Sequence, residues 1–417
     1  MKQKIAFIVQ RYGLEVNGGA EFHCRILAEH LKDTYDVTVL TSCAKNYLTW
    51  ADEYAEGETL INDIKVIRFA TNTMRDRKKF RVLNRKFKKR KPYQKVLRYL
   101  GLLDFYEKLV PSNITQEDND NWVKEQGPYL PGLINYLEEN QQQYHALIFF
   151  TYLYHPTIFG IKVAPEKSIL IPTAHDEAPI YFPFFKPFFK TPKAIMYNTE
   201  SEKSFVNTLF NNGDIYSNIA GVGVEATEPA VKHDVKTLLK TDAPYFIYIG
   251  RIDSGKGCQV MFDHFLAYVK ATTTDVKLVL VGQAFMKIPR HPAIIEMGFV
   301  DEDVKINLLQ NAQALLMPSF YESLSMVTLE SMAYGIPVIA NEGCEVLKDH
   351  IDKSQAGFVY HDYAGFKTAA DKIIKQQTDV ALLSSNAKKY VAKNYTWETV
   401  INKFNKMINY IKSNNFD

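Results

Sequence analysis

Short apolar runs alternate with helical stretches along most of this chain of 417 residues. The clearest example is the apolar run Ala314–Met317, which is followed by a polar loop, a helical stretch that ends at Gly335, and a second apolar run, Ile336–Ala340. A strand, a helix and a second strand in this order form a βαβ unit, whose two strands lie parallel in one sheet. The pattern therefore predicts the α/β class, with parallel sheets covered by helices on both faces.

The strand pattern occurs in two series, which indicates two domains. The expected strands are 4–9, 36–41, 64–69, 146–150, 168–173 and 194–199 in the first series, and 245–249, 277–281, 314–317 and 336–340 in the second. The segment 219–229 between them contains glycines and a proline, as a hinge does. We therefore expect two Rossmann-like doubly wound domains, 1–225 and 226–395, that face a cleft, and a helix at 396–417 that crosses back to the first domain.

The composition is that of a soluble globular protein, with 46% hydrophobic and 23% charged residues. No apolar run approaches the roughly 20 residues that a membrane span needs, and the apolar part of the N-terminus is too short for a signal peptide. The four cysteines are scattered without C-x-x-C spacing, which argues against a zinc site and fits reduced, buried thiols. A cytoplasmic location is expected.

A basic insert at about residues 75–98 contains thirteen Lys or Arg residues against one acidic residue, Asp76. Because the whole chain carries +3 and this segment +12, the rest of the chain carries −9. A local basic block on an acidic protein indicates an anionic partner. An anionic membrane surface and a polyanionic acceptor are both open, as is a solvated helix without a partner. Nucleic acid is not expected, because no recognition module accompanies the block.

A Gly-rich turn follows the expected strand 245–249. Gly250 ends the strand, and Arg251 and Lys256 lie in the turn before the next helix. Arginine offers a planar fork and lysine a point charge to phosphate oxygens, and glycines let the backbone approach an anion. The spacing is not that of a Walker motif. On its own, the turn is equally compatible with two solvated surface cations.

Two glutamates, Glu322 and Glu330, lie between the strands of the βαβ unit. We expect Glu322 where the loop becomes a helix and Glu330 about two turns into that helix, roughly 12 Å further along its axis. Their spacing alone is typical of a surface helix with solvated acids. Their place beyond the carboxyl end of a parallel strand favours ligand binding.

Taken together, these motifs resemble the retaining glycosyltransferases of family 4, which have the GT-B fold. The resemblance rests on Gly250-Arg251-x-x-x-x-Lys256-Gly257, on Glu322 and Glu330 within the segment 318–330, and on Gly335-x-Pro337-Val338. It extends to three further segments in the right order, which are Gly18-Gly19-Ala20-Glu21, His175-Asp176 and Gly298-Phe299-Val300.

The resemblance implies a role for each matching residue. The residues implied in catalysis are Arg251 and Lys256, which would neutralise the departing diphosphate, Glu322, which would bind hydroxyls of the donor sugar, and His175, which would contact the sugar from the other domain. Glu330 would bind the ribose. The remaining implied donor-binding residues are Gly18, Gly19, Gly250, Phe299, Val300, Ser323, Leu324 and Ser325.

One departure from the family pattern is visible. Many members have Gly-Phe-Gly where this chain has Ser323-Leu324-Ser325. Seryl side chains cap helices and bind phosphate, so we expect phosphate binding to persist. The preference for the sugar is the property that this change puts in doubt.

The implied activity is that of a hexosyltransferase-type, retaining, metal-independent enzyme without a cofactor. It would move a sugar from a nucleoside diphosphate donor to a hydroxyl of a saccharide or lipid-linked saccharide, as in surface polysaccharide assembly. A peripheral position on the inner face of the cell membrane is expected if the basic insert binds lipid. A nucleotide-sugar epimerase of the same fold and a non-catalytic sugar-nucleotide or polyanion-binding protein are the alternatives.

Three further patterns have structural explanations beside functional ones. The D-x-D strings Asp118–Asp120 and Asp301–Asp303 are metal signatures in another glycosyltransferase fold, but here they stand at helix starts, where acids favour the dipole. The aromatic run Tyr181–Lys190 is open between core and a surface patch. Beyond the strand 336–340, Glu345 is a candidate to reach a donor, whereas Cys344 is expected to be packed.

Overall fold

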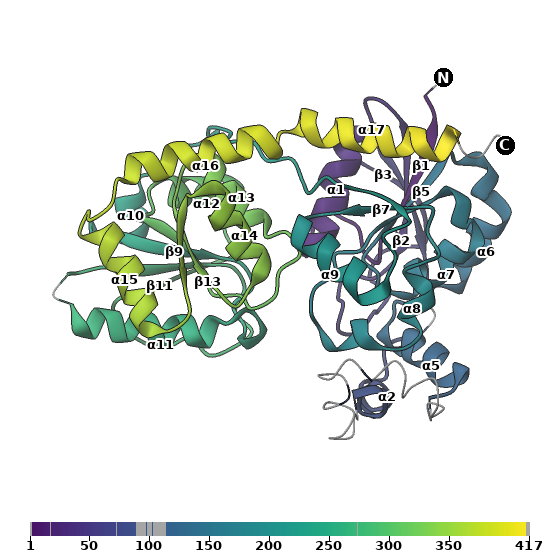
Figure 1. Ribbon diagram of the computed structural model, residues 1–417, viewed down its shortest axis with the longest axis horizontal. Helices are drawn as coiled ribbons and strands as arrows, with labels where there is room; N and C mark the ends of the chain where they lie inside the picture. Colours follow the sequence, from purple (N-terminus) through teal and green to yellow (C-terminus); the bar gives the residue numbers. More distant parts are fainter. Residues whose placement is uncertain are drawn as a thin grey trace. The chain divides into compact units, whose positions relative to one another are not determined.

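The computed structural model describes residues 2–16, 18–71, 73–88, 97, 102, 114–272 and 274–413 (Figure 1). The chain forms two compact units. The first holds the residues up to Tyr197, Ser204–Ile219 and the chain from Lys403 onward; the second holds Asn198–Lys203 and Ala220–Asn402. Each unit is built on one largely parallel sheet, which confirms the expected α/β class with two Rossmann-like domains.

Eight described strands form the sheet of the first unit in the order β3-β4-β2-β1-β5-β6-β7-β8. All neighbours are parallel except β3 and β4, which form an antiparallel pair at one edge. The central strand β1 pairs with β2 on one side and β5 on the other, so the strand order reverses between β1 and β5. The strand bounds are β1 (Lys4–Ile8), β2 (Asp36–Ser42), β3 (Gly57–Ile61), β4 (Ile64–Phe69), β5 (Ala146–Phe150), β6 (Ser168–Ile171), β7 (Ala194–Tyr197) and β8 (Tyr216–Ile219).

The helices that follow these strands connect parallel neighbours, as βαβ geometry requires. Those that the structure describes between residues 1 and 219 are α1 (Gly19–Leu31), α2 (Arg77–Lys88), α5 (Gln116–Gln126), α6 (Pro131–Asn140), α7 (His155–Val163), α8 (Phe185–Phe188) and α9 (Glu200–Phe210). The long helix α17 (Trp397–Ser413) adds its last part to the first unit, where the rings of Tyr216 and Tyr410 stack with centroids 4.0 Å apart.

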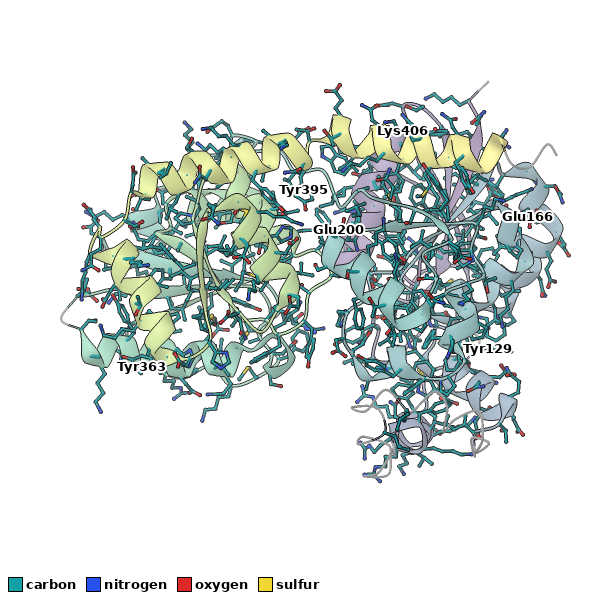
Figure 2. All side chains as sticks on the ribbon, viewed as in Figure 1. Tyr129, Glu166, Glu200, Tyr363, Tyr395 and Lys406 are labelled. Carbon is teal, nitrogen blue, oxygen red and sulfur yellow. The ribbon has the colours of Figure 1, made fainter. Side chains whose placement is uncertain are left out.

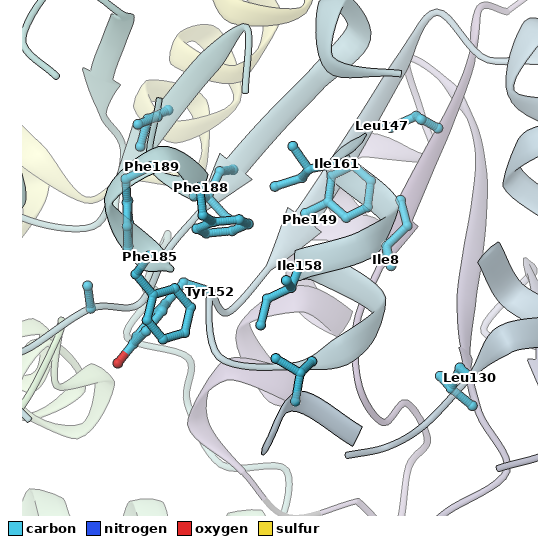
Figure 3. Packing of buried hydrophobic residues seen from close by; sticks show 14 of the residues in the cluster. Ile8, Leu130, Leu147, Phe149, Tyr152, Ile158, Ile161, Phe185, Phe188 and Phe189 are labelled. Atoms are coloured by element: carbon cyan, nitrogen blue, oxygen red, sulfur yellow. The ribbon is translucent and has the colours of Figure 1, made fainter. Parts of the chain in front are cut away.

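The aromatic run at residues 181–190 belongs to the core of the first unit. Phe185, Phe188 and Phe189 are fully or almost fully buried, and they lie beside Tyr152 and Phe149 in the same cluster (Figure 3). The run is folded into short turns that point successive rings inward. The surface-patch interpretation is therefore wrong for these rings, which stabilise the core instead.

The second unit has six described strands in the order β11-β10-β9-β12-β13-β14, all parallel. Their bounds are β9 (Tyr245–Ile249), β10 (Lys277–Val281), β11 (Ile294–Gly298), β12 (Ala314–Met317), β13 (Val338–Asn341) and β14 (Gly357–Tyr360). The helices are α10 (Val235–Leu239), α11 (Cys258–Ala271), α12 (Glu302–Gln310), α13 (Met326–Tyr334), α14 (Glu345–Ser354), α15 (Tyr363–Ile374) and α16 (Val380–Asn394).

The strand order of the second unit reverses between β9 and β12. From β9 the chain runs outward through β10 to β11, and from β12 it runs in the opposite direction through β13 to β14. In open parallel sheets, ligands bind beyond the carboxyl ends of the strands at such a reversal. Among the described helices, none is both long and apolar enough to cross a membrane.

Candidate functional site

The loops that follow β9 and β12 carry the cations and carboxylates that the sequence singled out. Arg251 and Lys256 follow β9, and Glu322 follows β12. Since these two strands are hydrogen-bonded neighbours, with Phe246 opposite Ala314, their loops leave the sheet side by side at the point of reversal. The residues therefore meet where the fold favours a ligand.

Gly257 brings the two loops into contact. It has a left-handed backbone with φ 74°, and a Cβ placed on it would lie 2.3 Å from the carbonyl oxygen of Pro318 in the other loop. That oxygen also accepts a hydrogen bond from Asn341 Nδ2 at 3.1 Å. Only glycine fits such a conformation at such a close approach. The Gly257 of the motif is thus explained by packing between the β9 and β12 loops.

This contact places Lys256 against Glu322. Lys256 Nζ lies 2.7 Å from Glu322 Oε1, and the Glu322 side chain is only 13% exposed, whereas Lys256 remains one-third exposed. The backbone amide of Lys256 donates to Asp253 Oδ1 at 2.9 Å, which caps the short turn Ser254–Lys256. The pair is a charge-assisted hydrogen bond between residues that are 66 positions apart in the chain.

Arg251 stands next to this pair on the same loop. Its guanidinium donates to the carboxylate of Asp253, and its side chain is 43% exposed. Asp253 therefore organises the turn twice, through the amide of Lys256 and through the side chain of Arg251. The result is two cations on one turn, each next to a carboxylate and each still open to solvent.

The helix expected to carry both glutamates begins later than the sequence indicated. Helix α13 starts at Met326, so Glu322 lies in the preceding loop and Glu330 is the fifth residue of the helix. The expectation that Glu330 lies two turns into the helix is therefore wrong. The cause is Ser325, which has a left-handed backbone with φ 61° and cannot continue a right-handed helix toward Glu322.

Glu330 has a lysine partner that sequence reasoning missed. Lys305 on α12 lies 3.1 Å from Glu330 Oε2 and 2.7 Å from Glu302 Oε1. Burial raises the pKa of Glu330, and the nearby ammonium of Lys305 only partly offsets this effect. Burial alone would lower the pKa of Lys305, but the two carboxylates outweigh it and raise the pKa. No local motif marks Lys305, because its partner is on the next helix.

Three neighbouring strands of this unit each lead into a glycine with positive φ, namely Gly250 after β9, Gly282 after β10 and Gly298 at the end of β11. A Cβ on Gly282 would lie 2.0 Å from the carbonyl oxygen of Gly250, so the two backbones are in direct contact. Beyond Gly298 stands Phe299, whose side chain is 75% exposed, and Val300 follows at intermediate exposure. Gly282 is the member of this row that sequence reasoning missed.

The predicted residues Gly18 and Gly19 lie in the first unit, at the start of α1 after β1. A Cβ on Gly18 would lie 2.2 Å from Glu21 Oε2. Glu21 is buried and accepts hydrogen bonds from Arg11 Nε at 2.9 Å and Nη2 at 2.6 Å. A buried ion pair therefore explains why Gly18 has no side chain. Nothing lies within 4 Å of a Cβ on Gly19.

His175, also in the first unit, follows β6 in a loop. Its Nε2 lies 3.7 Å from Glu177 Oε2, and Glu177 in turn accepts a hydrogen bond from Tyr152 Oη at 2.8 Å. The neighbouring Asp176 accepts from Tyr181 Oη at 2.6 Å. This loop is thus organised by carboxylates that bind tyrosines of the buried aromatic cluster.

The acidic strings stand at helix starts, and in each of them an aspartate accepts hydrogen bonds from backbone amides. Asp118 forms a capping box with Thr115 at the start of α5 and also pairs with Lys86. Asp303 accepts hydrogen bonds from the amides of Ala230 and Val231. In the described ranges, no three His, Cys, Asp or Glu side chains lie together as metal ligands would.

The acidic loop after β13 has a structural explanation as well. Burial raises the pKa of the Cys344 thiol to about 11, which agrees with a packed, unreactive cysteine. Glu342 pairs with Lys348 at 3.2 Å, and Glu345 is the first residue of α14. Glu345 is therefore placed to favour the N-terminal dipole of its helix.

The basic insert is described in part, because residues 89–96 and 98 lie outside the described ranges. Helix α2 buries Leu83 and Phe87 against the aromatic cluster, and Asn84 accepts a hydrogen bond from Trp122 Nε1 at 2.8 Å. The half-buried Arg75 donates to the carbonyl of Glu125 at 3.0 Å. The described helix of the insert, α2, is therefore packed onto the first unit along an apolar stripe.

The four exposed cations on the other side of α2 have no carboxylate partner among the described residues. They are Arg77, Lys78, Arg81 and Arg85.

Comparison with known proteins gives matches in both sequence and fold. Residues 243–376 match the family model of glycosyl transferases group 1. An uncharacterized glycosyltransferase of Methanocaldococcus jannaschii is 24% identical over 174 residues, which cover 39% of this chain and 44% of that protein. A glycogen synthase of Chlorobium phaeovibrioides is 28% identical over 153 residues, which cover 34% of this chain and 31% of that protein. The matched segments thus span less than half of these curated relatives.

Solved structures match over almost the whole chain at low sequence identity. Sucrose-phosphate synthase from Thermosynechococcus elongatus has a TM-score of 0.68 and 15% identity, covering 99% of this chain and 100% of that one. HepE from Anabaena, solved in complex with UDP and glucose, has a TM-score of 0.65 and 13% identity, covering 98% and 99%. These likenesses concern the fold. The chain has the GT-B fold, and its segment 243–376, which carries the β9 and β12 loops, matches the model of the glycosyl transferases group 1 family.

Proposed function

We propose that this protein is a retaining glycosyltransferase that moves a sugar from a nucleoside diphosphate donor to a hydroxyl of a saccharide acceptor. The observation that supports this most is the contact of Lys256 with Glu322 at the strand reversal, with Arg251 beside it. A cation and a carboxylate 2.7 Å apart offer complementary partners to the two ends of a sugar diphosphate. The match of segment 243–376 to the model of the glycosyl transferases group 1 family agrees with this.

The cations would stabilise the diphosphate as it leaves. Arg251 and Lys256 are partly exposed on a turn fixed by Asp253, so an incoming phosphate finds them already positioned. Positioned cations lower the energy of a transition state in which negative charge develops on the leaving group. Two such charges provide this without a metal ion or a cofactor.

The two glutamates would serve separate parts of the donor. Glu322 is held by Lys256 and Glu330 by Lys305, so each carboxylate has its own cation. Carboxylates accept hydrogen bonds from hydroxyl groups, which fits Glu322 at the sugar and Glu330 at the ribose. The backbone amides of Ser323, Leu324 and Ser325 would bind phosphate oxygens near the start of α13.

In this reaction the bond between the anomeric carbon and the donor phosphate oxygen breaks, and a bond from that carbon to the acceptor oxygen forms on the same face. The departing phosphate takes the acceptor proton, so none of these side chains needs to act as a base. His175 would contact the sugar, and Gly18 and Gly19 would approach the phosphates, as the family resemblance implies. Phe299 and Val300 would lie near the base.

UDP is the first nucleotide to test. HepE, which shares the fold, was solved with UDP and with UDP-glucose. Trehalose-6-phosphate synthase, another structure with this fold, was solved with UDP-2-fluoro glucose. Purified protein should be incubated with a panel of nucleotide sugars and saccharide or lipid-linked acceptors, and release of the nucleoside diphosphate should be measured. Anomeric configuration in the product, read by NMR, tests retention.

Glu322→Gln and Lys256→Met are each expected to lower kcat/KM by about a hundredfold, because each removes one charge from the transition-state site. Lys277→Met is the matched control. Lys277 pairs with Asp275 at 2.6 Å and is 15% exposed, against 32% for Lys256, but it stands at the amino end of β10, at the end of the strands opposite to the site. Equal activity in the Glu322 variant and the wild type would refute its role. Donor isomerisation without an acceptor would indicate an epimerase instead.

The acceptor side is proposed to lie at an anionic membrane, with a lipid-linked saccharide as acceptor and surface polysaccharide as its product class. Helix α2 supports this proposal, since its apolar stripe faces the protein and Arg77, Lys78, Arg81 and Arg85 are exposed. Each basic residue near an anionic leaflet contributes about 1 kcal/mol. Four such residues give roughly 4 kcal/mol, enough for reversible binding to the inner face of the cell membrane.

Binding to vesicles tests the membrane proposal. Arg81 and Arg85 are one helical turn apart on the same face. Arg81→Gln/Arg85→Gln is expected to weaken binding to vesicles of phosphatidylcholine with phosphatidylglycerol roughly thirtyfold, and added salt should weaken it further. Lys367→Gln/Lys375→Gln is the control; it removes two positive charges as well, one on α15 and one at the residue that caps its C-terminus. An equal loss of vesicle binding in the two double variants would contradict a specific role for α2.

A further inference from the structure

The loop between Glu322 and α13 holds an unfavourable backbone conformation. Ser325 has φ 61° and ψ 72°, in the left-handed region, and its side chain is almost fully buried. For a residue other than glycine this conformation is unfavourable, because the Cβ comes too close to the following carbonyl oxygen. Such a conformation persists only where the surroundings fix it. The relevant contacts are therefore those on the peptide that leads into Ser325.

A buried histidine holds that peptide. His350 on α14 has no exposed surface, and its Nε2 lies 2.8 Å from the carbonyl oxygen of Leu324. Its other ring nitrogen, Nδ1, lies 2.9 Å from Tyr390 Oη on α16. The rings of Tyr390 and Tyr395 meet the imidazole edge-on at 5.9 Å, and Tyr395 is labelled in Figure 2.

These contacts determine the tautomer of His350. A carbonyl oxygen only accepts hydrogen bonds, so Nε2 carries the proton and donates it to Leu324. Burial lowers the pKa of His350, which favours the neutral ring. In the neutral ring Nδ1 has no proton, so it accepts from the hydroxyl of Tyr390. His350 thus connects α16 to the backbone of the β12 loop through two hydrogen bonds.

The direction of one carbonyl fixes the direction of the next amide. The Leu324 carbonyl and the Ser325 N–H belong to one planar peptide group, in which they point in opposite directions. Since the carbonyl points at His350, the Ser325 N–H points away from it. No described residue accepts a hydrogen bond from this amide. An oriented amide without an intramolecular acceptor is suited to an anionic oxygen.

We infer that His350 is a positioning residue, which turns the Leu324–Ser325 peptide so that the Ser325 amide binds the donor diphosphate. The inference rests on the proposed function, because it needs a diphosphate at the β12 loop. It also explains how serine is tolerated at a position where the backbone favours glycine. The hydrogen bond from His350 and the contact between Ser325 Oγ and Thr328 Oγ1 at 2.9 Å hold the conformation that glycine adopts at no cost.

The test compares UDP with uridine, or the matching pair for the base that the wild type prefers, by isothermal titration calorimetry. His350→Phe keeps an aromatic ring but cannot donate to Leu324. It is expected to weaken UDP binding about tenfold or more and to change uridine binding little, because only the diphosphate meets the oriented amide. His350→Gln keeps an N–H at the position of Nε2 and is expected to restore most of the affinity.

Tyr390→Phe is the matched control. It alters the same buried cluster but leaves the donor to Leu324 in place, so its affinity for UDP should stay within about threefold of the wild type. Loss of UDP and uridine binding to the same degree in the His350→Phe variant would overturn the inference, since that result indicates general damage. Unchanged UDP affinity in that variant would overturn it as well.

A measurement on the unaltered protein covers the case in which His350→Phe does not fold. NMR of protein labelled with ¹⁵N-histidine should show His350 as the Nε2–H tautomer, and addition of UDP should shift the amide resonance of Ser325. The opposite tautomer or an unshifted Ser325 amide in the UDP complex would overturn the inference alone. If the wild type binds no nucleoside diphosphate, the proposed function fails, and the inference fails with it.

Discussion

The contact between Gly257 and Pro318 is expected to be the most sensitive backbone position in the second unit. Gly257→Ala would place a methyl group 2.3 Å from the Pro318 carbonyl oxygen, at a residue with φ 74°. The oxygen cannot withdraw freely, because Asn341 Nδ2 donates to it from the end of β13. Either the β9 loop or the β12 loop must therefore move.

The magnitude follows from three contributions. A left-handed alanine costs about 1–2 kcal/mol. Overpacking against a fixed neighbour adds about 1–3 kcal/mol, and a weakened hydrogen bond to the Pro318 oxygen adds about 1 kcal/mol. We expect Gly257→Ala to lower the free energy of unfolding of the second unit by roughly 3–6 kcal/mol. For a unit of this size, that is a fall in Tm of roughly 10 °C.

Gly298→Ala separates the clash from the backbone term. Gly298 has φ 67°, almost the value of Gly257, but no heavy atom lies within 4 Å of a Cβ placed on it. Gly298→Ala therefore destabilises the fold only through the left-handed backbone of the alanine. Part of this effect is offset, because alanine lowers the conformational entropy of the unfolded chain. The expected loss is about 1 kcal/mol. The difference between the two losses in free energy of unfolding measures how much the contact of Gly257 with Pro318 restricts the two loops.

Differential scanning calorimetry of the full chain gives the two Tm values, and hydrogen exchange in peptides from β9 and β12 assigns the transition to the second unit. Because Lys256 precedes Gly257, the alanine variant should also lose donor turnover at temperatures where it remains folded. Equal shifts in Tm for the two variants would refute the reasoning. So would normal turnover in Gly257→Ala, since the loop contact would then not be what positions Lys256.

The other predictions concern buried ionisable groups. Burial raises the pKa of Glu330, so affinity for UDP is expected to fall as the pH approaches that raised pKa from above, because a protonated carboxyl accepts ribose hydroxyls poorly. Glu330→Gln should give a flat profile of affinity against pH in calorimetry. The raised pKa means that protonation of Glu330 favours the folded state, so this loss of affinity should not be accompanied by unfolding through that group. Lys305→Met leaves the Glu330 carboxylate without its cation and should lower the free energy of unfolding, measured with denaturant, by about 2 kcal/mol. Lys353 is an exposed lysine, so Lys353→Met should change this free energy very little. Burial lowers the pKa of His155 to about 4, so the histidine takes up a proton at a higher pH in the unfolded chain than in the folded one. The free energy of unfolding of the first unit should therefore fall by about 3 kcal/mol between about pH 6.5 and about pH 4. His155→Gln should flatten the dependence of this free energy on pH in that range.

The sheets could be predicted from the sequence because their signal is local. Each buried strand is a run of apolar residues, and the runs at 146–150 and 245–249 match β5 and β9 residue for residue. Alternation with helices then leaves a parallel sheet as the arrangement that connects them. The positions of Arg251 and Lys256 at the carboxyl end of a strand follow from the same pattern.

The pairings within the site could not be predicted in the same way. Lys256 meets Glu322 because two glycine-containing loops touch, and Lys305 meets Glu330 because α12 and α13 are neighbours. Neither relation leaves a periodic mark in the sequence. The place of the aromatic run 181–190 stayed open in the sequence for a related reason, since rings that pack inward and rings that form a surface patch have the same composition.

The segment Ser323-Leu324-Ser325 shows how a departure from a family pattern acquires a physical meaning. In the sequence it is a loss of two glycines, which puts the choice of sugar in doubt. In the structure only Ser325 has a left-handed backbone, so among the three residues the chemical consequence of losing glycine is concentrated there. Its backbone is held by contacts from the opposite side of the loop, above all by His350. A serine at this position therefore bears on how firmly the Ser325 amide is oriented, in a loop that we propose to bind phosphate.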